Sequence, residues 1–513
     1  MAPVQPRNPF TGLLVRAAFS LFALSALLAA PAAAVAEDLR IEQVTIISPQ
    51  HAAPVKNATV TVHDERIVSI TTGSDMPAQV AGARILDGRG LYLAPGLIDS
   101  HVHLVLIPGM TPQQEQAHPA IAHAAREQIP RSYLYFGYTT LIDLVSTPEW
   151  MQQWEAHSLR PDTYFCGAAP VLDGYPMNSL PKPERYREMP YFLLEAYPGS
   201  AVPPGIDAAA HTPEAVVRRI KAAGARCVKT FFERGFGGAH DLPLPKLTTI
   251  RALVRAAHAA HLPVLMHANS SEAQRFAVAA GVDIIAHGLW NWDEPLRVTT
   301  LTPAVEKILD DVIAAKMGWQ PTIQVLDGLR GLFDPGVLSD PLLAQVLPAS
   351  LIEWYRTPEG QWFHDQTDRT MVTAAKGPRA HAEQARQIFG ALITRDESAV
   401  RYMAQHGGRI LFGTDTPSAP TYANAPGLNG WLEMHRLAEA GMTPAQIFRA
   451  ATIVNAEALG LSEVGTIAVG KRANLLLLRA DPSQTIEAYD DIADIILHGR
   501  VIDRITLRAD RLQ

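Results

Sequence analysis

Residues 95–103 of this 513-residue chain read Pro95-Gly96-Leu97-Ile98-Asp99-Ser100-His101-Val102-His103. A Pro-Gly turn followed by a short apolar run predicts a buried strand that begins near Leu97. Side chains two residues apart in a strand point to the same side, so His101 and His103 can reach one metal ion. The pair alone is a modest signal, but its position at the end of a strand predicts half of a metal site.

The same pattern, an apolar run followed by a metal-capable residue, recurs four times farther along the chain. Lys229 follows the run 227–228, His267 follows 263–266 and His287 follows 282–286. Asp415 follows the run 410–413, with Thr414 between them. A single histidine of this kind is commonly a hydrogen-bonded core residue, and Asp415 alone could cap a helix. The whole set favours a metal, because a buried carboxylate is costly unless a positive charge neutralises it.

Lys229 is the unusual member of the set, because its ammonium would repel a metal and would be expensive to bury. Two interpretations remain open. In the first interpretation, its amine has reacted with carbon dioxide and the resulting carbamate bridges two cations. Alternatively, Lys229 pairs with Glu233 or extends to solvent.

The middle of the chain alternates apolar strand candidates with amphipathic or Ala-rich helical segments. The strand candidates are residues 97–99, 139–144, 163–167, 227–230, 263–267, 283–287, 320–323 and 409–413, and the clearest helices are 216–223, 246–260, 271–280 and 303–315. Eight such units predict an α/β fold, a (β/α)8 TIM barrel, whose active site lies at the C-terminal ends of the strands. The metal-capable residues fall at those ends.

Both ends of the mature chain differ from the middle. Residues 38–93 contain short β-rich runs broken by turns, and residues 474–502 repeat that texture. Two such ends predict one small β-sandwich built from both termini. We therefore expect a β-sandwich part at 37–94, a hydrolase barrel at 95–461 and the rest of the sandwich at 462–513.

The N-terminus has the features of an export signal. Arg7 and Arg16 precede the apolar run 17–30, and Ala34-Val35-Ala36 offers small residues for cleavage. We expect removal of residues 1–36 and a periplasmic or secreted protein that is not held in a membrane. An uncleaved anchor is the alternative, although the apolar run is short for a full span.

Composition limits which partners the protein can bind and which side chains can bind a metal. The formal net charge is -7 and no long Lys/Arg run is present, which argues against nucleic acid as a partner. The two cysteines, Cys166 and Cys227, exclude a thiolate cage, so nitrogen and oxygen must hold any metal. In an exported protein the two could pair, which the sequence leaves open.

Two segments exceed the usual length of a connection, residues 173–211 and 324–378. Long excursions from barrel loops are usually lids or substrate walls, and the alternative is a surface insertion without function. Trp290, Asn291 and Arg234 closely follow candidate ligands, so we expect an aromatic-lined pocket with one cation. Arg234 could pair with a substrate carboxylate or lie exposed in a loop.

On these motifs the chain resembles the amidohydrolase superfamily, and within it the branch related to imidazolonepropionase and prolidase. The stretches that carry the resemblance are residues 95–103, 137–140, 281–288, 412–415, 441–445 and 465–471. They span nearly the whole mature chain. They are specific to the superfamily and say little about the substrate.

The resemblance implies a barrel with two divalent metal ions, usually zinc. His101 and His103 with Asp415 would hold the first ion, His267 and His287 the second, and N6-carboxylated Lys229 would bridge them. A metal-bridging hydroxide would attack the scissile carbonyl. Asp415 would accept its proton and return it to the leaving amine.

The chain departs from the family pattern at three places. Asn269 stands where a second histidine is common, and Asp173-Gly174-Tyr175-Pro176 replaces a Gly-rich histidine loop after strand three. Both changes lie on the expected substrate side and leave specificity open. Asn474 replaces an aspartate before a C-terminal strand, where we expect a structural role only.

The favoured function is a binuclear hydrolase of an amide or peptide-like C–N bond in a small molecule such as a dipeptide or an N-acyl amino acid. A mononuclear deaminase or cyclic-amide hydrolase is the alternative. That alternative would not need Lys229, and its usual glutamate, three residues after the strand-five histidine, is Ser270 here. A scaffold without metals would leave its histidines unused at a cost in stability. A homo-oligomer is left open.

Overall fold

The computed structural model of the protein describes residues 38–73, 82–195, 202–236, 241–371, 377–418 and 420–511. The residues from Ala36 to Gln513 cluster as one unit. The export signal predicted for residues 1–36 lies outside the described residues. Among the described helices, none combines the length and the apolar character that a membrane crossing requires.

The middle of the chain forms a parallel sheet of eight strands that pair in chain order. Its strands are β6 (Leu97–Val102), β7 (Tyr138–Asp143), β8 (Asp162–Ala168), β9 (Cys227–Phe231), β10 (Val264–His267), β11 (Ile284–Ala286), β12 (Gly318–Gln320) and β13 (Arg409–Ile410). The sheet curls, because backbone bonds join its first strand to the segment after its last. Ser100 N–H donates to the Phe412 carbonyl (3.2 Å), and Asp415 N–H donates to the His101 carbonyl (2.7 Å).

The eight predicted strands are confirmed, with shifted ends. The largest shift concerns the strand predicted at 320–323, which is β12 and ends at Gln320. Pro321 has no N–H for the ladder, and Thr322 has a φ of 55°, in the left-handed region. The chain therefore leaves the sheet one residue after Gln320.

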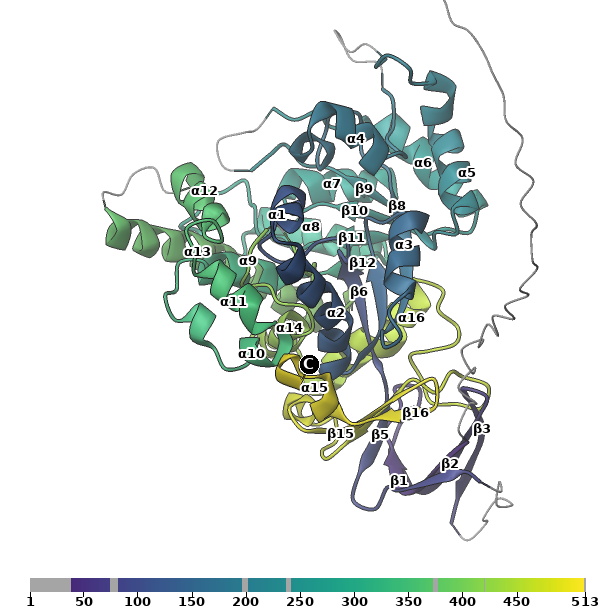
Figure 1. Ribbon diagram of the computed structural model, residues 1–513. Coiled ribbons are helices and arrows are strands. Elements are labelled where there is room, and N and C mark those ends of the chain that lie inside the picture. Colours follow the sequence, from purple (N-terminus) through teal and green to yellow (C-terminus); the bar gives the residue numbers. More distant parts are fainter. Residues whose placement is uncertain are drawn as a thin grey trace, which may run out of the picture. The chain divides into compact units, whose positions relative to one another are not determined.

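Helices follow the strands of the parallel sheet (Figure 1). They include α1 (Pro112–Ala117), α2 (Pro119–Tyr135), α3 (Pro148–Glu155), α4 (Lys182–Glu188), α5 (Pro213–Ala222), α6 (Leu247–Ala259), α7 (Ser271–Ala280), α8 (Pro303–Ala314), α13 (Pro378–Gln405), α14 (Leu428–Glu439), α15 (Pro444–Arg449) and α16 (Asn455–Ala458). Helix α7 has the bounds predicted. The Ser270 side chain accepts Ala273 N–H at its start, and Gly281 at φ 76° ends it.

An apolar cluster fills the inside of the curled sheet below the candidate site. Its strand residues are Ile98, Ile142, Cys166, Cys227, Leu265 and Ile284, with Leu411 after β13, and Leu459, Leu461 and Val464 pack against them. Alternate strand residues share a face, so Lys229 and His267 lie one layer above this cluster. Gly413 lies in the same layer. A Cβ atom on residue 413 would lie only 2.8 Å from the Cβ of His101, which is too close for a side chain. The sheet therefore supports the polar layer on a packed base.

Cys166 of β8 and Cys227 of β9 form a disulfide, which resolves the pairing that the sequence left open. The two residues are register partners in neighbouring parallel strands. Both are fully buried. The bond therefore joins two strands in the layer directly below Lys229.

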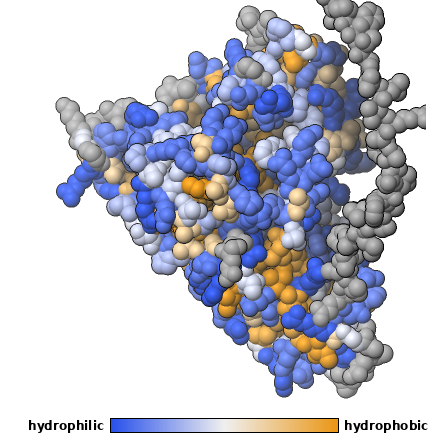
Figure 2. Space-filling view, viewed as in Figure 1, coloured by the Kyte–Doolittle hydropathy of each residue, from blue (hydrophilic) through white to orange (hydrophobic). Residues whose placement is uncertain are grey.

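Strands from both ends of the chain form a second, mixed sheet with the order β16-β15-β14-β5-β1-β2-β3, and β4 pairs with β1. They are β1 (Leu39–Ile46), β2 (Val55–His63), β3 (Arg66–Thr72), β4 (Arg84–Asp87), β5 (Tyr92–Pro95), β14 (Leu475–Leu478), β15 (Ile492–Leu497) and β16 (Arg500–Ile502). The predicted sharing of strands between the two ends is thus confirmed. Figure 2 shows residues of high hydropathy gathered over this sheet on the face in view.

Asn474 has the structural role expected of it. Its side chain donates to Asp162 Oδ2 at the start of β8 (2.7 Å) and accepts His498 N–H (2.9 Å). Asp162 also binds Arg472 (2.8 Å) and His498 (2.8 Å). These contacts join the mixed sheet to the parallel sheet.

The two long segments contain structure of their own. The first holds η1 (Met177–Ser179), α4 and η2 (Ala208–His211), and the second holds α9 (Ile323–Gly331), η3 (Val337–Ser339), α10 (Leu343–Val346), α11 (Ala349–Tyr355) and α12 (Trp362–Met371). The second segment bonds to the loop after β6: Tyr355 donates to the Pro108 carbonyl (2.5 Å) and Trp362 to that of Gly109 (3.0 Å). It therefore packs against the loop that follows His103.

Candidate metal centre

The six predicted ligands come from five places along the parallel sheet. They are His101 in β6, His103 just after it, Lys229 in β9, His267 in β10, His287 after β11 and Asp415 after β13. Carboxyl ends of parallel strands meet at one end of a sheet, so residues more than three hundred positions apart become neighbours. All except His103 are buried, and the His103 side chain is 17% exposed.

Asp415 lies close to both His101 and His103. His103 Nε2 lies at hydrogen-bond distance from Asp415 Oδ1 (2.8 Å), and His101 Nε2 lies 2.9 Å from the same oxygen, outside hydrogen-bond geometry. One ligand atom each from His101, His287 and Asp415 can be chosen within 4.8 Å of one another. This spacing suits a metal site, although neither His103 nor His267 belongs to this compact group.

His267 and His287 lie side by side, with ring centroids 4.5 Å apart. One ring nitrogen of each histidine also contacts a neighbouring side chain. His267 Nε2 lies 3.1 Å from Glu233 Oε2, and His287 Nδ1 lies 3.0 Å from Thr322 Oγ1. These contacts leave His267 Nδ1 and His287 Nε2 for a ligand, which is how outer partners commonly orient metal-binding histidines.

Lys229 is 1% exposed, and its Nζ has no hydrogen-bond partner among the described residues. Glu233, its alternative partner, bonds instead to His267 and to Asn269 (3.1 Å each). Burial lowers the pKa of Lys229 to about 7. A neutral amine is the form that reacts with carbon dioxide, so the chemistry of the residue suits a carbamate.

Burial also governs the charges of the histidines and of Asp415. Desolvation, together with the Lys229 charge, lowers the pKa of His101 to about 3. Burial alone would raise the pKa of Asp415, but the charges of His101 and His287 hold it well below its ordinary value. Asp415 is therefore the anionic member of the set, which suits a bound cation.

The donor set fits divalent metal ions. Both ring nitrogens of His101 and the Lys229 Nζ are buried without hydrogen-bond partners among the described residues, which is costly unless something else binds them. Nitrogen and carboxylate oxygen are ligands that Zn²⁺ accepts. The histidines and the carboxylate of this set can therefore hold a metal ion.

Three residues of the centre have left-handed backbone conformations. These are His287 (φ 82°), Thr322 (φ 55°) and Asp415 (φ 55°). Such conformations cost about 1–3 kcal/mol each in residues other than glycine, and they cluster at functional sites. The fold therefore holds the strand-end residues in conformations that a free chain would rarely adopt.

Asp99 is a residue of the centre to which the sequence analysis gave no role. It is fully buried, and its carboxylate accepts Thr414 Oγ1–H (2.6 Å), Thr414 N–H (3.1 Å) and His101 N–H (3.1 Å). Desolvation raises its pKa to about 7, against the effect of the Thr414 bonds. Asp99 thus holds β6 against the segment that carries Asp415. In the sequence, the feature that could have pointed to this role is a carboxylate inside an apolar run.

Tyr175 and Glu233 also belong to the centre. The Tyr175 ring centroid lies 4.8 Å from that of His267, and burial raises the pKa of the Tyr175 hydroxyl. Burial would raise the pKa of Glu233, but the His267 bond and charge hold it below its usual value. In sequence Tyr175 was a departure from the family pattern, and Glu233 was only a partner considered for Lys229.

The three predicted substrate residues have different surroundings. The Trp290 ring lies 5.5 Å from that of His287, and Asn291 donates to Asn269 Oδ1 (3.2 Å). Arg234 instead forms two bonds with Glu272 (2.7 Å each), and its side chain is 50% exposed. A role for Arg234 in carboxylate binding would need that pair to break.

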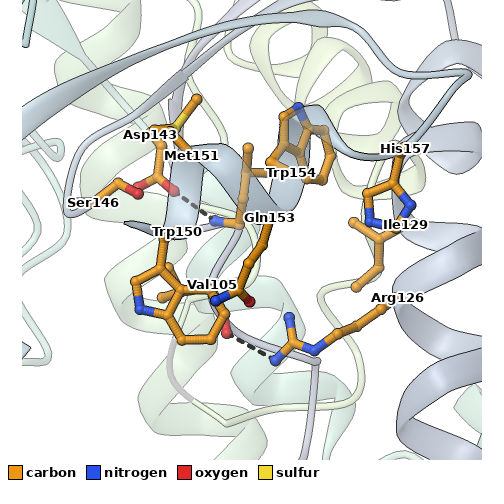
Figure 3. Close-up of a pocket in the computed structure, with 11 residues that line it drawn as sticks. Val105, Arg126, Ile129, Asp143, Ser146, Trp150, Met151, Gln153, Trp154 and His157 are labelled. Atoms are coloured by element: carbon orange, nitrogen blue, oxygen red, sulfur yellow. Dashed lines mark hydrogen bonds between the residues drawn. The ribbon is translucent and has the colours of Figure 1, made fainter. Parts of the chain in front are cut away.

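A small cavity lies among Val105, Asp143 and side chains of helices α2 and α3 (Figure 3). Its volume is about 40 Å³, and Leu104 and Asp143 line it together with residues of α2 and α3. Asp143 Oδ2 accepts Leu104 N–H (3.1 Å). The carboxylate therefore fixes the chain just beyond His103, and the cavity has room only for water-sized molecules.

Comparisons with known proteins identify the family of the chain. The model of the Amidohydrolase family matches residues 92–502. An imidazolonepropionase from Anaeromyxobacter dehalogenans is 40% identical over 60 residues, which are 11% of this chain and 14% of that protein. The chain therefore matches only a small part of that relative.

Solved structures resemble most of the chain. One is a Xaa-Pro dipeptidase with bound methionine in the active site (18% identity, TM-score 0.61, 91% of this chain and 100% of that chain). Another is a prolidase complexed with N-methylphosphonate-L-proline (21% identity, TM-score 0.61, with the same coverage). At this identity the likeness shows the fold.

Proposed function

The chain belongs to the amidohydrolase family, and from this premise we propose that it is a binuclear metal-dependent hydrolase of an amide or peptide-like C–N bond. The enzyme class, a hydrolase that acts on C–N bonds, follows from the family. The number of metals, the bridging lysine and the substrate are the proposal.

The observation that carries the proposal is the buried amine of Lys229. It is buried in the same layer as His267, and its Nζ has no hydrogen-bond partner among the described residues. A mononuclear site would leave this amine unexplained. A carbamate on Nζ would offer two oxygens, one for each of two metal ions.

We assign His101, His103 and Asp415 to the first ion, His267 and His287 to the second, and carboxylated Lys229 to both. When bound, two such cations, most simply zinc, would lower the pKa of a shared water and polarise the substrate carbonyl. Asp415 would accept the proton of that water at a carboxylate oxygen and deliver it to the leaving amine. Glu233 and Thr322 would keep the rings of His267 and His287 in place.

We further propose a small-molecule amide such as a dipeptide or an N-acyl amino acid as the substrate. The dipeptidase and the prolidase of similar fold support this class. The buried site, with Tyr175 over His267, suits a small molecule rather than a folded chain.

We also propose that the parallel sheet closes into a (β/α)8 barrel at 95–461, and that the mixed sheet is a β-sandwich built from 37–94 and 462–513. Export after removal of residues 1–36, to the periplasm or the medium, completes the proposal. The Cys166–Cys227 disulfide supports export, because structural disulfides persist in oxidising compartments.

Metal analysis of the purified protein is the first test, and about two zinc ions per chain are expected. One ion per chain would favour the mononuclear alternative, and none would favour a scaffold. The second test is Lys229→Ala, which should abolish amide hydrolysis and lower the metal content, with partial rescue by short carboxylic acids. Full activity of this variant would overturn the bridging role.

A further inference from the structure

We propose that the second long segment, residues 324–378, contains a further ligand site, which binds an α-amino acid with an apolar side chain. The site is a cavity, here called the segment pocket, that is lined by Leu332, Phe333, Asp334, Arg356, Gln361 and Tyr422 among others. None of its described lining residues is one of the six candidate metal ligands. The inference therefore goes beyond the proposed function and does not depend on it.

The segment pocket has the size of a small-molecule site. Its volume is about 340 Å³, and cavities that bind small molecules span about 300–1,000 Å³. The cavity of Figure 3, at about 40 Å³, has room only for water-sized molecules. The segment pocket is therefore large enough for one amino acid and too small for a long peptide.

The floor of the segment pocket is apolar and held in place. Leu332, Phe333 and Tyr422 are buried. The Tyr422 ring lies 5.3 Å from that of Tyr355, and its hydroxyl donates to Gln361 Oε1 (3.2 Å). Aromatic rings whose polar groups already have partners offer apolar surface to a ligand. The floor therefore suits an apolar side chain.

The rim of the segment pocket carries one charge of each sign. Arg356 and Asp334 are exposed, and neither forms an ion pair with another described residue. Arg356 Nη2 donates to the Leu338 carbonyl (2.6 Å), and Asp334 Oδ1 accepts Gly336 N–H (2.8 Å). The guanidinium therefore has donors left for a ligand, and the carboxylate has an oxygen left.

These two charges select a ligand that carries both a carboxylate and an ammonium group. Because Arg356 and Asp334 line one cavity, a single small molecule can reach both. Arg356 would attract a simple carboxylic acid but Asp334 would repel it, and the reverse holds for a simple amine. The third titratable group of the lining, His364, already contacts Asp365 (2.9 Å). An α-amino acid combines both charges with a side chain for the floor.

The test compares three ligands that share a phenyl ring. They are L-phenylalanine, 3-phenylpropanoate, which lacks the ammonium group, and 2-phenylethylamine, which lacks the carboxylate. Titration calorimetry on the metal-loaded protein measures their binding. We expect L-phenylalanine to bind about tenfold more tightly than either analogue, since each analogue loses one charged contact. No binding of L-phenylalanine, or equal binding of all three, would overturn the inference.

Two variants show whether the ligand lies in the segment pocket. Arg356→Gln should weaken L-phenylalanine and 3-phenylpropanoate by about tenfold and leave 2-phenylethylamine unchanged. Asp334→Asn should weaken L-phenylalanine and 2-phenylethylamine and leave 3-phenylpropanoate unchanged. Both side chains are exposed, so the variants should fold. Unchanged affinity for L-phenylalanine in both variants would place it elsewhere, such as at the metal centre, and would overturn the inference.

Asp340→Asn is the matched control for Asp334→Asn. Asp340 is also exposed in the same segment, and its Oδ1 also accepts a backbone N–H two residues on, that of Leu342 (2.8 Å). It does not line the segment pocket, so its variant should bind L-phenylalanine as the wild type does. An equal loss in this control would trace the effect to net charge or to the turn and would contradict the assignment.

The outcome for this site is separate from the outcome for the metal centre. A protein that holds two metals and hydrolyses amides but does not bind L-phenylalanine through Arg356 and Asp334 would disprove this inference alone. A protein without metal or turnover that still binds L-phenylalanine through these two residues would disprove the proposed function alone.

Discussion

His267 depends on Glu233 for the orientation of its ring. The Glu233 carboxylate holds His267 Nε2, accepts Asn269 Nδ2–H and binds Gly235 N–H at its other oxygen (2.8 Å). Asn291 extends this network through Asn269. Three polar side chains and the backbone N–H of Gly235 therefore form the network that holds the ring, which leaves Nδ1 for a metal.

We predict that Glu233→Ala weakens zinc binding by about 10- to 100-fold, because loss of an outer partner frees the ring and lowers its basicity. Glu233→Gln should lose less, since an amide oxygen can still accept from His267. Chelator competition measures both. Glu272→Ala is the control, because Glu272 pairs with Arg234 at the surface. Equal zinc affinity in Glu233→Ala and the wild type would rule out the positioning role.

The disulfide is the clearest feature of the strands themselves. Cys166 and Cys227 are 61 residues apart in sequence and face each other from neighbouring strands of the parallel sheet. No sequence pattern predicts this pairing, because it depends on the register between β8 and β9. The bond closes the loop that carries Tyr175 and α5.

Loss of this bond should destabilise the protein by about 4 kcal/mol, since it constrains the unfolded chain over a long loop. Cys166→Ala/Cys227→Ala, compared with the wild type by denaturant unfolding, measures the effect. A reductant should lower the midpoint of the wild type and leave that of the double variant unchanged. The same midpoint with and without reductant in the wild type would contradict a stabilising bond.

Helices α9 and α14 are joined by a buried carboxylate. Glu433 of α14 is fully buried, and its oxygens accept Ile323 N–H (3.2 Å) and Gln324 N–H (2.7 Å) at the start of α9. Desolvation raises the pKa of Glu433 to about 8, despite these two bonds. The folded protein therefore holds a proton here that the unfolded chain releases at lower pH.

The proton on Glu433 gives the pH dependence of stability a definite sign. Between about pH 4.5, the ordinary pKa, and pH 8, the folded state binds more protons at Glu433 than the unfolded state, so its contribution to stability falls as pH rises. Glu433→Gln should flatten the decline in thermal stability across that range. Glu439→Gln, an exposed change on the same helix, should leave the slope unchanged. An unaltered slope in Glu433→Gln would exclude this proton as its source.

The molecule as a whole depends on contacts between its two sheets. Asp162 at the start of β8 receives Arg472, Asn474 and His498 from the C-terminal segment. Burial would raise the pKa of Asp162, but the bond and charge of His498 and the charge of Arg472 lower it. The stabilisation from this carboxylate is therefore present above pH 4 and is lost as pH falls below the ordinary pKa of aspartate.

Asp162→Ala should cost about 3 kcal/mol or more, because it leaves Arg472 and His498 without a buried partner. Thermal unfolding at neutral pH measures the loss. At low pH the variant and the wild type should converge. Asp310→Ala, which removes an exposed carboxylate bonded to Tyr402, is the control and should change stability little. A small loss in Asp162→Ala would mean that the two sheets are joined by other contacts.

Local sequence determined much of this protein. Pro95-Gly96 and the apolar runs predict the strands, the helical pattern of 271–280 predicts α7, and the residues that end the runs predict which side chains lie at the same end of the sheet. These features depend on neighbours in the chain, so a short window contains them. The predicted strand 320–323 is wrong in its bounds, because Pro321 and the left-handed Thr322 end β12 at Gln320.

The tertiary structure alone decided how those side chains are used. In the tertiary structure Cys166 pairs with Cys227, and Glu233 binds His267 instead of Lys229. Arg234 pairs with Glu272, and the Tyr175 ring lies against the His267 ring. Each outcome is a competition between partners that lie far apart in sequence. Strand register and burial decide such competitions, because they set which atoms come within bonding distance and what an unpaired charge costs.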